Sequence, residues 1–316
     1  MMIRTKAAWG VCALLVLTLG PVSLGAQAQD PQDPQAPPAP VPPLTPASQT
    51  APAVPPPATD PDLRLDPLQP DFNLAALPVT LRLPKGKMSF RVTHRFTRSL
   101  GRGDMADLAS DLFGFDSGAQ IGLEVRYGLR PGTQIGVNRT SDRTIEIFGQ
   151  QSVLQQNDTR PIGLDVIATI EGANNFVHTQ GATGENVPAQ KSSALGLIAS
   201  RKIARLAAVY AEPIVVFNTN SLPSGPGVDN NTFMLGLGTR VRIRPTAYIV
   251  AEMTPRLAGY TPGVTQGSIG LEGRVGGHTF QINFSNGFGT TLGQIARGGI
   301  GTNSWFIGFN ISRKFF

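Results

Sequence analysis

The sequence predicts an all-β fold: a transmembrane antiparallel β-barrel of about 12 strands that follows a disordered, proline-rich N-terminal segment. Three observations predict it. The chain begins with an export signal, and segments of about ten residues with alternating polarity occupy residues 88–316. The connections between these segments alternate between short and mostly long. Together these features are typical of a barrel in a bacterial outer membrane.

Residues 1–28 have the pattern of a secretory signal peptide. Two basic residues precede the apolar run VCALLVLTLG, and the tripeptide AQA at 26–28 fits a cleavage site. The apolar run is too short for a comfortable membrane span. The single cysteine, Cys12, lies within it. We therefore expect the exported chain to have no disulfide and no cysteine metal ligand.

Residues 29–87 form a second segment, rich in proline, alanine, glutamine and aspartate. Repeated proline favours extended polyproline II structure and blocks helices and central strands. Such a composition buries too little apolar surface to order itself. We expect a disordered periplasmic segment, either a solvated spacer or an arm that contacts the cell wall or a periplasmic partner.

The segments after residue 88 alternate with a period of two. In QIGLEVRYGL, at 120–129, Ile121, Leu123 and Val125 fall on one face, while Glu124 and Arg126 fall on the other. The same alternation recurs along the chain and predicts twelve strands, at 88–100, 120–129, 133–141, 144–155, 161–174, 192–203, 206–219, 231–243, 246–259, 268–276, 278–289 and 303–316.

The connections indicate an orientation. Every even-numbered connection, such as RPG or RPT, is short, whereas most odd-numbered ones are long. In outer-membrane barrels the periplasmic turns are short, the extracellular loops are longer, and both termini are periplasmic. A soluble sandwich gives no reason for this regularity, although alternation alone does not separate a soluble barrel with its charges outside from a membrane barrel.

In lipid the apolar face of each strand points outward and the polar face lines the lumen. The strand residues predicted to line the lumen are Arg91, Arg95, Glu124, Arg126, Asp165, Glu171, Lys202, Arg240, Arg242, Glu252, Arg256, Glu272 and Arg274. A barrel of this size is intermediate between filled eight-stranded barrels and wide porins. We expect a narrow pore for small solutes or ions, with a mild preference for anions because the net charge is +6.

The chain ends in NSWFIGFNISRKFF, which resembles the final amphipathic strand that marks outer-membrane barrels for their assembly machinery. The residues expected to form this assembly signal are Trp305, Ile307, Phe309, Ile311, Phe315 and Phe316. More narrowly, FRVTHRF at 90–96, FGFDSGA at 113–119 and NISRKF at 310–315 are similar to an uncharacterised bacterial outer-membrane β-barrel family, known as a domain of unknown function. The resemblance implies a barrel over residues 88–316 in the outer membrane, in contact with its lipid, and implies no established activity.

Other functions have weaker support. The chain has no basic cluster or recognition motif for nucleic acid. We expect no enzyme activity, no cofactor and no metal site, because His94, His178 and His278 fall on different parts of the barrel. Two alternatives remain open: a non-conducting structural barrel whose proline-rich arm binds a partner, and a lipid-modifying barrel enzyme that would use His94 with Ser89 or Asp116. Loop 101–119 is expected to be solvated, or to fold into the lumen as a short plug.

Overall fold

The computed structural model describes residues 66–180, 184, 186–187, 189–220 and 230–316. The predicted signal peptide, and residues 29–65 of the segment predicted to be disordered, lie outside the described residues. Within the described residues, no helix combines the length and the apolarity needed to cross a membrane.

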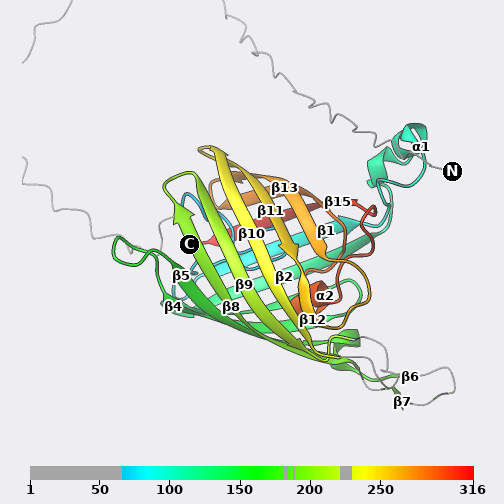
Figure 1. Cartoon of the computed structure of the whole chain (residues 1–316), viewed down its shortest axis with the longest axis horizontal. Helices are drawn as coiled ribbons and strands as arrows, with labels where there is room; N and C mark the ends of the chain where they lie inside the picture. Colours follow the sequence, from blue (N-terminus) through cyan, green and yellow to red (C-terminus); the bar gives the residue numbers. More distant parts are fainter. Residues whose placement is uncertain (1–65, 181–183, 185, 188, 221–229) are drawn as a thin grey trace, which may run out of the picture. The chain divides into compact units, whose positions relative to one another are not determined.

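The predicted barrel of twelve antiparallel strands is confirmed (Figure 1). Each strand pairs with its neighbours, and β1 pairs with β15 to close the barrel. The strands of the barrel are β1 (Met88–Phe96), β2 (Ala119–Arg130), β3 (Thr133–Thr140), β4 (Ile145–Leu154), β5 (Gly163–Gly172), β8 (Lys191–Ile203), β9 (Ala207–Phe217), β10 (Thr232–Arg244), β11 (Ala247–Thr254) with β12 (Arg256–Gly259), β13 (Gln266–Val275), β14 (His278–Ser285) and β15 (Phe306–Phe315).

Two prolines within strands mark local breaks in the ladders. Pro255 separates β11 from β12, which together act as one strand beside β10. Pro213 lies in β9, where the pairing with β8 skips from Ile214 to Ala211. Proline has no N–H to donate, so each proline removes one hydrogen bond from a sheet that has no free edge.

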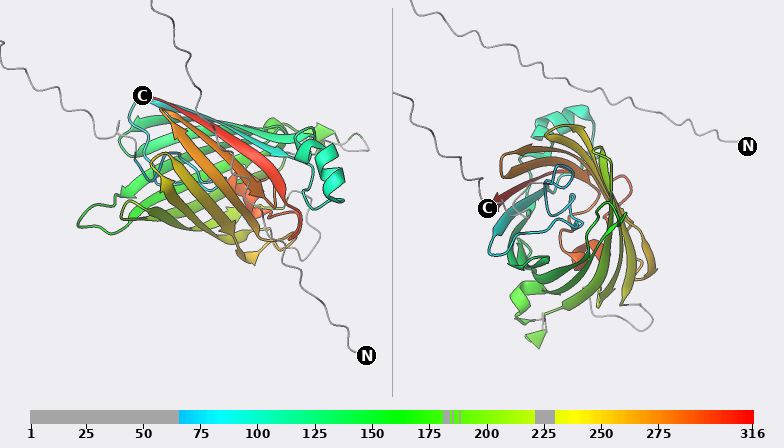
Figure 2. Two further views of the ribbon diagram at one scale, coloured as in Figure 1. Left: turned by 90° about the horizontal axis from the view of Figure 1, so that it is seen from above. Right: turned by 90° about the vertical axis from the view of Figure 1, so that its left-hand side faces the viewer.

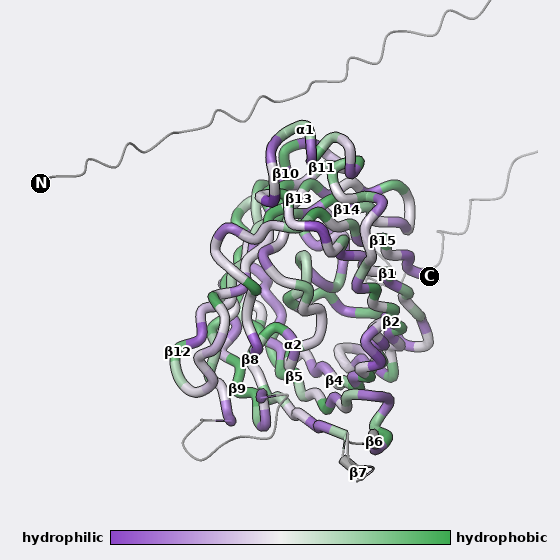
Figure 3. The backbone as a smooth tube through the Cα atoms, turned by 90° about the vertical axis from the view of Figure 1, so that its right-hand side faces the viewer, coloured by the Kyte–Doolittle hydropathy of each residue, from purple (hydrophilic) through white to green (hydrophobic). Residues whose placement is uncertain are grey.

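The alternation of polarity follows from the pleat of the strands. In β2, Leu123, Val125 and Tyr127 are exposed on the outer surface, whereas Glu124 and Arg126 are buried inside. Figure 3 shows this alternation of hydrophobic and hydrophilic residues along the strands. An outer surface with this much exposed apolar side chain fits a lipid environment.

The two ends of the barrel differ. Met88 and Phe315 pair at one end, which also carries the short turns, such as 131–132 and 245–246. We call this the terminal end. The opposite end, the loop end, carries α1 (Met105–Ser110), η2 (Leu112–Gly114), η3 (Ala173–Phe176), β6 (Thr179–Gln180) and β7 (Asn186–Val187).

Residues 66–87 correct the sequence prediction. They were expected to belong to a disordered segment, yet residues 66–83 fold as a hairpin inside the barrel (Figure 2). Phe72, Leu74, Leu77 and Val79 are almost completely buried there. The composition rule considers only the surface that a segment can bury by itself. Here the barrel supplies the surface, and we call residues 66–83 the inserted hairpin.

A second segment enters the lumen from the loop end. The connection between β14 and β15 forms the short helix α2 (Leu292–Ala296), all five residues of which are buried. Figure 3 shows α2 within the ring of strands. Loop 101–119, the sequence candidate for a plug, instead places α1 at the surface with no buried residue. The alternative of a plug in that loop was therefore wrong, and its expected solvated form is what the structure has.

Candidate functional site in the barrel lumen

The inserted hairpin turns sharply at its tip, residues 73–78. Asn73 and Pro78 form an antiparallel bridge, and the N–H of Leu74 donates to the carbonyl oxygen of Leu77 at 2.8 Å. Behind the tip, the N–H of Val79 donates to Phe72 O at 2.8 Å. These bonds satisfy part of the backbone, and the remaining groups of the tip turn toward the barrel wall.

Glu252 of β11 accepts hydrogen bonds from the tip main chain. The N–H groups of Ala75, Ala76 and Leu77 point at its carboxylate, with distances of 2.9 to 3.1 Å. Successive N–H groups in a turn form a concave site for an anion. The carboxylate therefore meets three donors at once, and hydrogen bonds to a charged acceptor are stronger than those between neutral groups.

The carbonyl oxygens of the tip face basic and amide side chains on the opposite side. Arg91 donates to Ala75 O at 2.8 Å and Arg95 donates to the same oxygen at 3.1 Å. Asn310 of β15 also donates to Ala75 O, at 3.1 Å. Three side chains from the two strands that close the barrel therefore share one main-chain acceptor.

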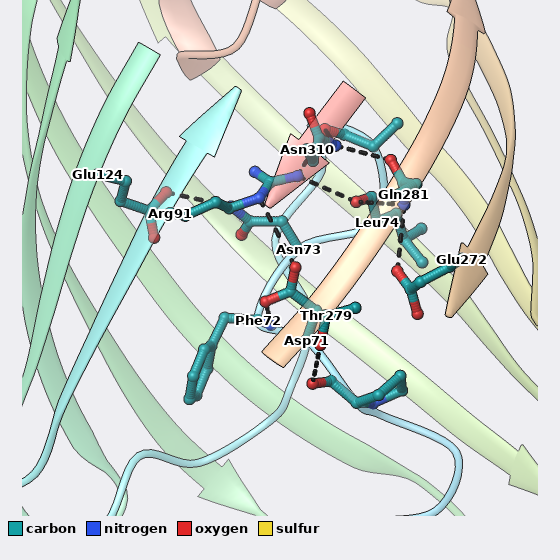
Figure 4. Close-up of polar contacts among 12 residues, drawn as sticks. Asp71, Phe72, Asn73, Leu74, Arg91, Glu124, Glu272, Thr279, Gln281 and Asn310 are labelled. Carbon is teal, nitrogen blue, oxygen red and sulfur yellow. Dashed lines mark hydrogen bonds and ion pairs between the residues drawn. The ribbon is translucent and has the colours of Figure 1, made fainter. Parts of the chain in front are cut away.

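Further contacts extend this polar side along the hairpin (Figure 4). Arg240 donates to Asn73 O at 2.8 Å and pairs with Glu272 at 2.9 Å. Lys314 and Thr279 both donate to Pro70 O. Most of these contacts reach the main chain of the hairpin, so they depend on its backbone path more than on its side chains.

An aromatic pair holds Arg126. Its guanidinium lies 5.1 Å from the ring centre of Phe72, in the hairpin, and 4.6 Å from that of Phe148, in β4. The same group pairs with Glu124 at 3.0 Å and donates to the Asn73 side chain at 3.2 Å. Cation–π contacts are stronger when water is excluded, as it is here.

Another part of the lumen wall is mainly apolar, although Arg240 and Glu252 lie on two of its strands. It is formed by nine buried wall residues on β5 and β8–β11, which pack with Leu68, Leu74, Ala76, Leu77 and Val79 of the hairpin and with residues of α2. We call these nine residues the apolar wall: Ile167, Ala194, Ile198, Ala208, Tyr210, Ile214, Val216, Met234 and Val250. Burial of these side chains stabilises the inserted state by about 25 cal/mol for each Å² removed from water.

Two glycines in β10 make room for the hairpin leucines. A Cβ at Gly238 would lie 2.2 Å from Cδ1 of Leu74, and one at Gly236 would lie 3.1 Å from Cδ1 of Leu77. A larger residue at Gly238 would collide with the leucine. The wall is therefore recessed where the hairpin tip presents its bulky side chains.

The α2 segment meets two carboxylates of the wall. Leu292 N–H donates to Glu146 at 3.0 Å, and Thr291 donates to Glu171 at 2.5 Å. Arg297 pairs with Glu171 at 2.7 Å. A cavity of about 20 Å³ remains between the hairpin and α2, which is room for about one water molecule. A cavity of about 150 Å³ lies at the terminal end, lined by residues such as Gln69 and Lys202.

The structure places the predicted lumen residues in two groups. Nine lie buried inside the barrel, and these are Arg91, Arg95, Glu124, Arg126, Asp165, Glu171, Arg240, Glu252 and Glu272. The other four, Lys202, Arg242, Arg256 and Arg274, are partly exposed. Lys202 pairs with Asp66 at 2.9 Å, and Arg256 donates to main-chain carbonyls at the loop end, including Tyr260 O. Solvent does not reach the middle of the lumen, where Arg240 is 0% exposed.

Sequence reasoning missed the inserted hairpin and its amide partners. Asn310, Gln281 and Gln150 contact the hairpin, but an uncharged amide on a polar strand face gives no signal of its own. A signal did exist in the hairpin sequence. LQPDFNLAALPVTLRL, at 68–83, contains large apolar residues at a density that the tract before it lacks.

The two histidines on barrel strands, His94 and His278, lie on the outside of the barrel. His94 lies on the outer face of β1, with its ring stacked 4.8 Å from that of Phe309, whereas Ser89 on the same strand faces the lumen. The pairing of His94 with Ser89 in the enzyme alternative is therefore wrong, because the two side chains point to opposite faces of the strand, whereas the pairing with Asp116 stays a prediction. His278 contacts Arg313 on the outside. Among the described residues, no group of three or more histidine, cysteine or acidic side chains could hold a metal.

The residues predicted as an assembly signal lie at the end of the chain on β15 or next to it. Phe309, Ile311 and Phe315 alternate on the outer face, and Phe316 follows the last strand residue. Trp305 precedes the strand, and its indole N–H donates to Thr302 O at 3.1 Å. Their role in assembly stays a prediction.

Comparisons with known proteins agree with this fold. The family model described as a membrane bound beta barrel domain, DUF5777, matches residues 72–315. The match includes most of the inserted hairpin. The comparison with curated proteins found no match.

Three solved structures illustrate the structural similarity. A KdgM porin in complex with disordered oligogalacturonate has 8% identity and a TM-score of 0.46, and the alignment covers 72% of this chain and 99% of that one. The COG4313 outer membrane channel from Pseudomonas putida F1 has 9% identity and a TM-score of 0.47, with 74% and 97% covered. Outer membrane phospholipase A from Escherichia coli has 12% identity and a TM-score of 0.39, with 73% and 94% covered.

Proposed function

The chain belongs to this family of membrane-bound β-barrel domains, and from that premise we propose that it forms an outer-membrane passage for small solutes, which the inserted hairpin keeps closed at rest. The sequence suggested a narrow pore. In the proposal the pore is conditional, because solutes cross only while the hairpin is displaced from the lumen.

One observation carries the proposal: the hairpin enters and leaves the lumen at the same end. Asp66 pairs with Lys202 near the terminal end of β8, and Gly86 N–H donates to Gly128 O beside the β2–β3 turn. A segment that crosses one end twice withdraws without threading and without opening the barrel. The predicted export signal and the loop lengths favour a periplasmic location for that end.

The charged lining supports passage. When the hairpin withdraws, wall residues such as Arg91, Arg95 and Glu252 become accessible to water and to polar solutes. Charged rings and ladders set the selectivity of pores.

A second candidate function is a permanently closed structural barrel. The shared apolar cluster of hairpin, wall and α2 favours it, because this cluster resembles a protein core. In that case the segment before residue 66 serves as an arm toward the cell wall or a periplasmic partner, and the barrel is its membrane anchor.

Single-channel recording separates these functions. Wild type should be mostly silent, while the double variant Leu74→Ala, Leu77→Ala should open at least tenfold more often, because it loses apolar packing of the tip and keeps the wall intact. Heat-resistant mobility in gels checks that both barrels are folded. A folded double variant that stays silent would support the permanently closed barrel instead.

A disulfide supplies the matched control. The side-chain oxygens of Thr80 in the hairpin and Ser200 in β8 are hydrogen-bonded at 2.6 Å, so the two side chains point at each other as those of a disulfide must. Adding Thr80→Cys and Ser200→Cys to the loosened variant, with Cys12→Ser, should abolish opening under oxidation, and reductant should restore it. Channel openings that persist under oxidation, with the disulfide formed, would contradict the proposal.

A further inference from the structure

We propose that the lumen contains a receptor site for short peptides with small and aliphatic side chains, and that the hairpin tip, Asn73–Leu77, occupies this site as an internal ligand. The inference rests on the proposed function, because the site is free only when the hairpin is displaced. It names the class of solute that competes with the tip.

The wall recognises groups that any peptide main chain offers. On one side, Glu252 accepts from the N–H groups of three successive residues. On the other side, Arg240, Arg91 and Arg95 donate to the carbonyl oxygens of Asn73, Leu74 and Ala75. Acceptor and donor groups of the wall therefore flank the tip on two sides and bind its main chain in the turned conformation of residues 73–78.

The side-chain surroundings select by size and polarity. Leu74 occupies the recess at Gly238, and Leu77 lies near Gly236. Ala76 packs in the apolar cluster between larger groups. A peptide with charged or bulky aromatic residues at these positions would leave a buried charge or would collide with the wall. The site therefore suits alanine-like and leucine-like residues.

The charges left behind by the tip match a free peptide. The pairs Arg126–Glu124 and Arg240–Glu272 join wall residues and persist without the hairpin. Arg91, by contrast, loses Asp71 and two carbonyl partners, and Glu252 loses all three of its donors. A peptide main chain in the register of the tip would restore these contacts, with its carbonyl oxygens at Arg91 and Arg95 and its N–H groups at Glu252.

Competition with the tip tests the proposal in the full chain. Ala76→Cys, in a Cys12→Ser background, places one buried thiol in the tip, where a small apolar residue is accommodated. The probe is the pentapeptide Asn-Leu-Ala-Ala-Leu, acetylated and amidated at its ends so that no terminal carboxylate lies beside Glu252. Its binding should keep the tip out and raise the rate of maleimide labelling at least fivefold, with saturation.

Two control peptides and two protein variants define the outcome. The mirror-image pentapeptide and the variant Asn-Ser-Ala-Ala-Ser should leave the labelling rate near its value without peptide. Glu252→Gln should weaken the response to the L-peptide at least tenfold relative to its own rate without peptide. Arg313→Gln, on the outer face of β15, is the matched control and should leave the response unchanged.

Some results would overturn the proposal. Equal acceleration by both enantiomers, or a rise that never saturates, would mean that the peptide acts on the membrane or the detergent and not at this site. Labelling does not depend on ion passage. Stereospecific labelling without any channel conductance would therefore support the peptide site and refute solute passage. Channel conductance without stereospecific labelling would support passage and refute the peptide site.

Discussion

The two sides of the lumen hold the inserted hairpin by different physics. On the polar side, Arg91, Arg95 and Asn310 bind main-chain oxygens. On the apolar wall, Ile198, Ile214 and Met234 belong to a cluster that encloses the hairpin side chains. Hydrogen bonds are directional, while apolar burial is not. The polar side therefore fixes the position of the hairpin, and the apolar wall supplies much of the tendency to stay inserted.

This difference predicts how each side responds to substitution. On the polar side, the loss of one partner leaves buried groups unsatisfied, which is costly even when the shape is kept. On the apolar wall, the free-energy cost of a substitution should increase with the side-chain volume that it removes or adds. Maleimide labelling of Ala76→Cys, in the Cys12→Ser background, measures the free energy of hairpin release when closing is faster than labelling.

The largest effect should come from Glu252→Ala. Three N–H groups would lose their acceptor in a buried place, and we expect release to become easier by about 3 to 5 kcal/mol. Labelling should accelerate more than a hundredfold. Glu252→Gln keeps one acceptor oxygen, so it should make hairpin release easier by a smaller amount. Equal labelling of wild type and Glu252→Ala would show that water already reaches these groups.

Leu77→Ala should have the next largest effect, about 2 to 4 kcal/mol, because Leu77 is fully buried in the apolar cluster. Leu77→Met conserves volume and should cost less than about 1.5 kcal/mol in the same labelling assay. A similar cost for both variants would indicate that shape, and not volume, governs this side.

Gly238→Ala should ease release by about 1 to 2 kcal/mol, because the new Cβ would collide with Leu74. The double variant Gly238→Ala, Leu74→Ala should recover part of that loss, since the methyl group then fills space that the leucine vacates. A double-mutant cycle on labelling rates measures this coupling. Purely additive effects would contradict a close contact between residue 238 and Leu74.

Asp66→Asn should have the smallest effect, below about 1 kcal/mol. The pair Asp66–Lys202 lies near the mouth of the lumen, and the Lys202 side chain is 33% exposed. Partly exposed pairs are screened by salt. The change in labelling rate should become smaller as the salt concentration rises. An effect that persists at high salt would mean that water and ions reach this pair less than the exposure of Lys202 indicates.

The barrel could be predicted from the sequence because its pattern is local. Each strand shows its two faces within about ten residues, and the loop lengths distinguish the end with short turns from the end with long loops. The twelve predicted segments correspond to the observed strands, and even the interruption at Pro255 lies at a residue whose missing N–H could be foreseen.

The contents of the lumen could not be predicted in the same way. The hairpin around Leu74 is ordered by residues as distant as Asn310, and a proline-rich composition hides that possibility. The entry of the β14–β15 connection into the lumen was not predicted, and the plug alternative named loop 101–119, because the helical pattern near Leu108 does not reveal which way a loop folds. The charges at Arg91 and Glu252 were placed by alternation, but their main-chain partners were not.

The oxygen atom of Ala75 joins the beginning and the end of the barrel. It accepts from Arg95 in the first strand and from Asn310 in the last, which lies 235 positions after Ala75 in the chain. Until β1 meets β15, both strands have unpaired edges that could pair with other chains. The same turn that closes the lumen therefore also ties the two strands of the seam to one acceptor and should slow the reopening of that seam.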